Sequence, residues 1–569
     1  MISNGKYILF TFCCLLLTSL ASAQQKKLDS LKDEVIKEFN PTITDAVKIN
    51  DNPGYADTTT RIPAQLYSIS PKPMPTVFDV IPIKPARMQG EPLTQLYNAF
   101  VKLGIGNAGF ENPGLFNNAV LNGELFYNSL RSKDYTWGTH YNFLNSPSEI
   151  PGYGNSSYSD NDFNLYGKRF YSTETLSANL DISRNVMHYY GYDMIPATLS
   201  EEQIRQRFLY ISPALRFCSH YKDSTRFNYD GGFKYYNLQD LWKVNENSFK
   251  ADVNMQGYYE KQLITGYASV DYYNTRNSVD TVTHTIVHVF PSIAFKTEKW
   301  KLNIGVDVVC DFSQVTTPNY YPTINFNYNV IGNMLIPYAG VDGGYDVNSY
   351  KSLSDVNPFI SQSAVLMNSD RHEGYLGLRG TVDSKTSYNI KATYSIIDNM
   401  PFFVQDTSGT ALQKQLNKFA LVYDNVTYLN LHGEIGYQET EKLLLLGKLD
   451  YNHYQMSNEL RPWYKPEVEV TLSAHYNLRD KFVIKGDLFF LGKQLAKTYV
   501  INDQAVPKVE IVPKELNGVT DVNLGLEYKY RKLMSFFLNF NNIAGFRYQR
   551  WNNYPTQGFF FMAGTAITF

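Results

Sequence analysis

The sequence predicts an all-β protein, a transmembrane antiparallel β-barrel of about 22 strands that follows an extended, proline-rich N-terminal arm. Three observations predict it: an export signal, a long series of segments in which apolar and polar side chains alternate, and a chain that stops on phenylalanine. Beyond the signal there is no apolar run of the roughly twenty residues that a membrane-spanning helix needs. An exported chain that crosses a membrane with strands must close them into a barrel.

Residues 1–23 are interpreted as a signal peptide. Lys6 gives a positively charged start, the stretch 7–20 is apolar, and Ala21-Ser22-Ala23 matches the small-residue cleavage site of exported proteins. The alternative, an N-terminal membrane anchor, is disfavoured because about fourteen apolar residues are too few to span a bilayer. The mature chain is therefore expected to begin at Gln24.

Residues 24–95 form the predicted arm. The segment carries nine prolines in 72 residues, with Pro71, Pro73 and Pro75 at every second position. Because proline lacks an amide donor and fixes φ, this stretch suits neither a central strand nor a long helix. It is expected to be extended, in the periplasm or in the barrel lumen.

Residues 96–569 form the predicted barrel. The alternation of apolar and polar side chains also fits a soluble β-sandwich, so the lengths of the loops must distinguish the two folds. In membrane barrels, short periplasmic turns alternate with longer outside loops. Tight breaks such as 479–481 and 531–532 do alternate with long polar stretches such as 349–370 and 499–518. Counting strands in this way gives 22, within a range of about 18 to 24. The count requires 419–438 to be one long strand.

Strand periodicity also assigns side chains to faces. The last strand places Phe559, Phe561, Ile567 and Phe569 on one face, and a terminal aromatic residue resembles the signal that the barrel-assembly machinery of bacterial outer membranes reads. A second set of polar side chains is predicted to face the lumen: His432, Glu434, His475 and Glu527.

The last fifty residues or so carry a resemblance to a known family. The run 536–543, then Tyr548, Tyr554-Pro555 and Gly558-Phe559, resembles the last hairpin of TonB-dependent receptors, whose barrels also have 22 strands. The resemblance implies an outer-membrane transport protein. The chain departs from the family in its arm, which is too short and too rich in proline to be the globular plug that those receptors carry. In this respect the chain is similar to plug-less barrels that Bacteroidota encode beside their receptors.

The resemblance further implies partners for the arm. Receptors of this family pair a short N-terminal segment with TonB, and Glu34-Val35-Ile36-Lys37 lies at a matching place; the same four residues also fit the end of a short solvated helix. The expected partners are therefore outer-membrane lipids, and TonB or another periplasmic or outer-membrane protein through residues 24–95. The arm, inward-folded loops or a partner is expected to fill the lumen.

Other function classes find little support in the sequence. A net charge of −2 without clustered Lys and Arg argues against nucleic-acid binding. There is no G-x-S-x-G, H-E-x-x-H or Walker motif, so neither an enzyme nor a cofactor or metal site is expected. The leading hypothesis is transport of an unidentified substrate across the outer membrane. The alternative is an accessory subunit of an outer-membrane assembly or secretion complex, and a passive porin or a rim enzyme is less favoured.

Overall fold

The computed structural model describes most of the barrel region, namely residues 98–108, 119–130, 132–147, 150–192, 199–222, 226–277, 280–313, 318–407, 417–440, 442–502 and 508–569. The predicted signal peptide, the arm and the segment 34–37 lie outside the described residues. Among the described residues no helix is both long and apolar enough to cross a membrane.

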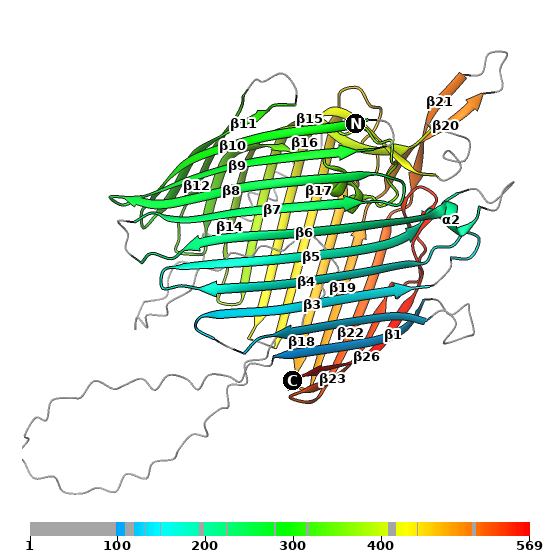
Figure 1. Cartoon of the computed structure of the whole chain (residues 1–569), viewed down its shortest axis with the longest axis horizontal. Coiled ribbons are helices and arrows are strands. Elements are labelled where there is room, and N and C mark those ends of the chain that lie inside the picture. Colours follow the sequence, from blue (N-terminus) through cyan, green and yellow to red (C-terminus); the bar gives the residue numbers. More distant parts are fainter. Residues whose placement is uncertain are drawn as a thin grey trace, which may run out of the picture. The chain divides into compact units, whose positions relative to one another are not determined.

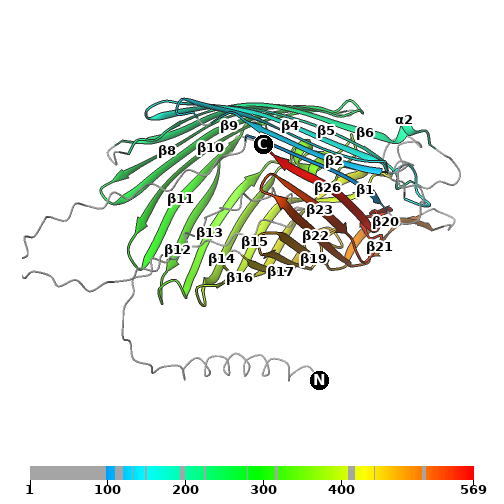
Figure 2. The same cartoon turned by 90° about the horizontal axis from the view of Figure 1, so that it is seen from below.

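Twenty-two antiparallel strands form one closed sheet, each pairing with its neighbours around the ring (Figures 1 and 2). In chain order they are β1 (Ala99–Ala108), β2 (Ala119–Asn128), β3 (Tyr135–Ser146), β4 (Tyr158–Phe170), β5 (Glu174–His188), β6 (Arg205–Ser219), β7 (Asn228–Gln239), β8 (Asn245–Tyr259), β9 (Gln262–Arg276), β10 (Thr281–Lys296), β11 (Trp300–Asp311), β12 (Asn319–Tyr328), β13 (Ile336–Asp346), β14 (Ser369–Thr381), β15 (Thr386–Gln405), β16 (Phe419–Glu439), β17 (Leu443–Met456), β18 (Val468–Leu478), β19 (Phe482–Leu491), β22 (Val519–Arg531), β23 (Met534–Asn541) and β26 (Phe560–Thr568). The structure confirms the predicted fold class and strand number.

The first and last strands close the ring. β1 pairs with β2 on one side and with β26 on the other, with Phe100 opposite Thr568 (Figure 2). At the seam the amide of Phe569 donates to the carbonyl of Ala99 at 2.8 Å, and the amide of Asn98 donates to the carbonyl of Phe569 at 2.8 Å. Closure leaves no unpaired strand edge in the membrane, where an unmade backbone hydrogen bond is costly.

The two rims differ in their connections. The seam and the tight turns share one rim, which is the periplasmic rim of such barrels, and the longer connections lie at the other, extracellular rim. Along β16 the exposed apolar side chains Leu431 and Ile435 alternate with the less exposed His432 and Glu434. Apolar side chains thus face lipid and polar ones face the lumen, as in a barrel of the outer membrane.

The structure differs from the sequence prediction on the extracellular side. The stretch 499–518, expected to be a loop, contains most of a hairpin of β20 (Gln494–Asn502) and β21 (Lys508–Leu516), seen in orange in Figure 1. The stretch 549–558 contains the small hairpin of β24 (Gln549–Trp551) and β25 (Tyr554–Pro555). Before this hairpin, β23 ends at Asn541, because Asn542 has a φ of 47°, which breaks the strand.

Candidate functional site in the capped lumen

The extracellular connections pack against one another. In the ring of 22 strands β15 stands ten positions from β5, almost the far side of the barrel, yet the residues that follow β5 contact those that follow β15. Connections from opposite walls can meet only by crossing the mouth of the barrel. We call this assembly the loop cap; it comprises the described residues of 189–204, 240–244, 347–368, 406–418, 457–467, 494–516 and 542–559.

The loop cap has an apolar core of its own. Its fully buried side chains include Tyr189, Tyr350, Phe419, Trp463 and Tyr554, which come from five different connections or strand ends. Tyr554 also stacks on Phe359, with 3.7 Å between ring centroids. Large aromatic side chains contribute more buried apolar area than any others, so this core holds the cap together.

Gly191 lies where three connections touch. The side-chain amide of Asn417 donates to the carbonyls of Gly191 and Asn552, each at 3.1 Å, and the hydroxyl of Tyr554 donates to the carbonyl of Asn417 at 3.0 Å. A Cβ at residue 191 would stand 2.6 Å from the carbonyl oxygen of Asn553. Only glycine allows the backbones to approach this closely.

Two buried carboxylates fasten the loop cap to the wall. Glu246, fully buried on β8, accepts hydrogen bonds from the backbone amides of Tyr350 at 2.7 Å and Lys351 at 3.1 Å, at the start of the short helix α3 (Tyr350–Val356). Asp424, on β16, accepts from backbone amides of residues 457–459 at 2.8 to 3.1 Å. Each carboxylate satisfies amides that would otherwise be buried without acceptors. A further short helix, α2 (Glu201–Ile204), leads into β6.

A cavity of about 1070 Å³ lies in the lumen below the loop cap. Tyr190, Phe359 and Gln557 of the cap form its roof, and its walls come from β1–β5 and from β19, β22, β23 and β26. Its lining continues down to Ser535 and Ala566, close to the periplasmic rim. The cavity therefore follows one side of the lumen for most of the height of the barrel.

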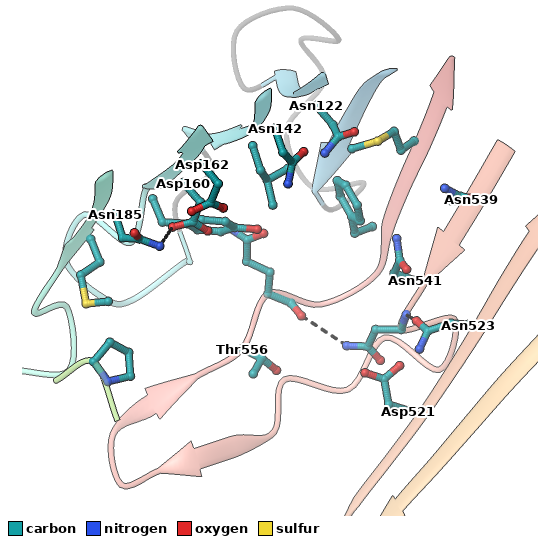
Figure 3. A pocket seen from close by; sticks show the side chains of 18 of the residues that line it. Asn122, Asn142, Asp160, Asp162, Asn185, Asp521, Asn523, Asn539, Asn541 and Thr556 are labelled. Carbon is teal, nitrogen blue, oxygen red and sulfur yellow. Dashed lines mark hydrogen bonds between the residues drawn. The ribbon is translucent and has the colours of Figure 1, made fainter. Parts of the chain in front are cut away.

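Most of the residues that line the cavity have side chains that can form hydrogen bonds, and apolar side chains lie among them. Figure 3 shows Asp160, Asp162 and Asn185 on one wall and Asp521 and Asn523 on the other. Seven asparagines, six carboxylates and three lysines line it among the described residues. Asparagine both donates and accepts, so these walls can bind a polar solute in many orientations. The excess of carboxylates over lysines favours a neutral or cationic solute over an anion.

Several of these groups already have partners within the protein. Asp160 accepts a hydrogen bond from Asn185 at 3.0 Å, and Asp521 accepts one from the hydroxyl of Tyr548 at 3.0 Å. Lys351 pairs with Asp355 at 2.5 Å, so one of the three lysines is neutralised locally. These contacts hold the side chains in place before a solute arrives, which lowers the entropy cost of binding.

The polar residues predicted from the sequence are distributed over the lumen wall. Glu527 lines the cavity, whereas His432 contacts Asp450 at 2.7 Å and Glu434 at 3.1 Å on another part of the wall. His475 lies opposite Lys485 in the register of β18 and β19. In the part of the chain that the structure describes, no three His, Cys, Asp or Glu side chains gather as metal ligands would.

The predicted assembly-signal residues lie at the seam. Phe561 and Ile567 alternate on β26 with Met562 and Ala566, which line the cavity, and so face away from the lumen. Phe559 stacks near Phe540, with 6.2 Å between ring centroids. The terminal Phe569 is largely exposed.

Apart from Glu527, the sequence analysis did not single out the residues that build the roof and walls of the cavity. Asp160 and Asp162 do show the i, i+2 spacing of a lumen-facing pair, and so do Asp521 and Asn523. Many other pairs around the barrel show the same spacing. Nothing in the local sequence tells which of them the loop cap roofs over.

The fold is shared with solved outer-membrane receptors. The siderophore receptor PirA from Acinetobacter baumannii aligns with a TM-score of 0.64 at 9% identity, covering 84% of this chain and 81% of that one. Two further structures align with a TM-score of 0.62. The ferric enterobactin receptor PfeA from Pseudomonas aeruginosa is 11% identical, and the alignment covers 83% of this chain and 80% of that one. The FrpB iron transporter from Neisseria meningitidis is 10% identical, and the alignment covers 83% of this chain and 81% of that one. No protein-family model and no curated protein matches the sequence. The likeness shows that the chain shares the large closed barrel fold of these proteins.

Proposed function

We propose that this chain is a receptor-like transporter that takes up a polar solute across the outer membrane. The observation that carries the proposal is the cavity, which is roofed by the loop cap and follows the lumen from Gln557 to Ala566. A roofed cavity suits a receptor that binds its solute and then passes it on, whereas a passive pore needs an open mouth. The shared fold supports the same reading, since the aligned proteins are described as siderophore receptors and an iron transporter.

The arm completes the proposed mechanism. A barrel of this width is normally plugged. We propose that residues 24–95 act in or below the lumen in place of a globular plug, and that Glu34-Val35-Ile36-Lys37 is the segment that contacts TonB. Opening of the loop cap would admit the solute, and movement of the arm would release it into the periplasm.

A solute-depletion experiment tests the proposal. Cells with and without the chain are grown in a complex medium, and the loss of solutes from the medium is compared by mass spectrometry. The chain is expected to deplete a small group of polar solutes, and Asn541→Trp, which fills the cavity from β23, is expected to abolish the depletion. Leu538→Trp on the opposite face of the same strand is the matched control. Equal depletion by cells with and without the folded barrel would contradict the proposal.

The second candidate is the accessory subunit of an outer-membrane assembly, and the β20–β21 hairpin favours it. The hairpin reaches beyond the strands of the barrel (Figure 1), and an isolated two-stranded ribbon is only marginally stable in water. Ile511 and Val512, neighbours on β21 and therefore on opposite faces of the ribbon, are both exposed. Ile511→Ser together with Val512→Ser should release a co-purifying protein if this candidate is right, and should leave solute depletion unchanged.

A further inference from the structure

One ammonium group is buried in the loop cap and, among the described residues, forms no ion pair with a carboxylate. Lys418, which immediately precedes β16, is 1% exposed, and its Nζ lies 3.8 Å from the centroid of the Trp242 ring and 4.6 Å from that of Tyr189. Its hydrogen-bond acceptor in the described part of the chain is the side-chain oxygen of Gln362, at 2.9 Å. None of the ion pairs among the described residues includes it.

This arrangement is the chemistry of an ammonium-binding aromatic cage. Aromatic faces attract a cation within about 6 Å of the ring centroid, most strongly when water is excluded, and proteins use such cages for alkylated ammonium ligands. Tyr189 is held in place by its hydroxyl, which donates to the carbonyl of Ile360 at 3.5 Å, and Trp242 by its indole N–H, which donates to the carbonyl of Arg205 at 3.2 Å. Both rings are therefore positioned by groups other than Lys418.

The cage joins four connections through one ammonium group. Tyr189 follows β5, Trp242 follows β7, Gln362 follows β13 and Lys418 follows β15. If Lys418 left, the connection that precedes β16 would lose this shared contact with the other three and would keep the hydrogen bond of Asn417 to Gly191. The cage residues themselves do not line the cavity, but Tyr190, which follows Tyr189 in the chain, forms part of the cavity roof.

The ammonium of Lys418 is only weakly held. Burial lowers the pKa of Lys418 to about 8, although Asp240 and Asp406 oppose the shift. A primary ammonium has three donors to satisfy, and among the described residues this one has one acceptor, Gln362, besides the ring faces. A quaternary ammonium has no N–H donors, so its burial in the same cage leaves no donor unsatisfied.

We propose that Tyr189 and Trp242 form an exchangeable binding site for an alkylated ammonium group, which Lys418 occupies while the cap is closed. A solute that bears such a group displaces Lys418, and the loss of that contact loosens the loop cap over the cavity. This inference rests on the proposed function and names the solute class of the same site. The carboxylate excess in the cavity is a separate observation that favours a cation.

Calorimetric titration of the full-length protein in detergent with tetramethylammonium chloride tests the site. Lys418→Ala empties the cage, so the probe is expected to bind at least about tenfold more tightly to this variant than to the wild type. Trp242→Leu in the Lys418→Ala background should abolish the gain. Lys497→Ala is the matched control, because Lys497 is also buried in the cap near a tryptophan but pairs with Glu459 at 2.8 Å, and it should leave probe affinity unchanged.

A measurement on the wild type keeps the test decisive should the variants misfold. Tetramethylammonium is expected to raise hydrogen exchange in α3 and in residues 457–467, whereas sodium chloride at the same ionic strength should not. Equal exchange in both salts, or a folded Lys418→Ala protein that binds the probe no better than the wild type, would overturn the inference. Probe binding without any solute depletion by cells would instead reject the proposed function and leave the ammonium site standing.

Discussion

The carboxylate of Glu246 accepts a hydrogen bond from the backbone amide of Tyr350 at 2.7 Å, which ties strand β8 of the wall to helix α3 of the loop cap. The same carboxylate accepts from Lys351, Thr275 and Tyr236, and the side chain is fully buried. One acceptor group thus satisfies two amides and two hydroxyls. The closed cap depends on this kind of wall-to-loop contact as much as on its apolar core.

Glu246→Ala should therefore open α3 without unfolding the barrel. Buried donors left without acceptors cost about 1 to 3 kcal/mol each, so a local loss of roughly 3 kcal/mol or more is expected. Hydrogen exchange in residues 350–356 should rise by at least about a hundredfold, while exchange in β8 changes little. Glu246→Gln, which keeps one oxygen acceptor, should show a smaller effect. Unchanged exchange in α3 would mean that other contacts hold it.

Asp424 makes the corresponding contact for the connection between β17 and β18. Asp424→Ala removes the acceptor for amides of residues 457–459 and should make this segment the first site of proteolysis in the folded protein. Limited proteolysis with mass mapping measures this directly. Asp398→Ala, on neighbouring β15 and without such contacts to the cap among the described hydrogen bonds, is the control and should be cleaved as the wild type is.

Gly191→Val should loosen the cap by a steric route. Its Cβ would stand 2.6 Å from the carbonyl of Asn553 and 2.8 Å from the ring of Tyr554, distances that force the two connections apart. Overpacking of this kind typically costs about 1 to 3 kcal/mol. The expected readout is greater accessibility of Tyr554 to chemical labelling. Gly167→Val, where a Cβ meets nothing within 4 Å, should be neutral.

The stability of the cap should rise with pH above neutrality. Lys418 has a pKa of about 8 in the closed cap and an ordinary value near 10.5 when the cap opens. Below pH 8 Lys418 is protonated in both the closed and the open cap, and burial of its charge destabilises the closed cap. Between about pH 8 and 10.5 Lys418 is neutral in the closed cap and still charged in the open one. The free energy of cap opening therefore increases by up to about 3 kcal/mol over this range.

Urea titrations of cap opening at pH 7.5 and 9.5, followed by tryptophan fluorescence, should show this gain, and Lys418→Met should remove it. Methionine has a side chain of similar length to that of lysine and no titrating group, so this variant removes the charge while it keeps the packing. A wild-type cap that weakens between these two pH values would show that the charged form of Lys418 is the favoured one.

Deletion of Phe569 should impair closure at the seam. The residue supplies a backbone donor to Ala99 and an acceptor to Asn98, and its ring is exposed on the periplasmic end of the barrel. We expect a lower fraction of folded barrel in the outer membrane, measured by heat-modifiable migration on gels. Phe569→Trp, which keeps an aromatic end, should fold normally if recognition of that end matters.

The barrel could be predicted from the sequence and the loop cap could not, because local periodicity reports strands but not contacts between distant connections. Period-2 alternation is a local signal, and it located β16 as one strand of 21 residues as well as the tight turns of the periplasmic rim. The contact between Tyr189 and Lys418 joins residues 229 positions apart, and no local pattern encodes it. The β20–β21 hairpin was missed although the sequence of β21 alternates between apolar and polar residues, as at Val509, Glu510 and Ile511. Strands were counted between alternating short turns and long loops, and this count leaves out a strand pair that lies outside the barrel wall.

Conductance of the purified chain in planar bilayers tests the central claim, a lumen path closed from outside by the loop cap, most directly. The wild-type chain should conduct little. Gly191→Val combined with Tyr554→Ala, in a chain that begins at Gly90, should open large channels, because cap and arm are then both disabled. Large conductance by the wild type, or none by the folded variant, would contradict the account.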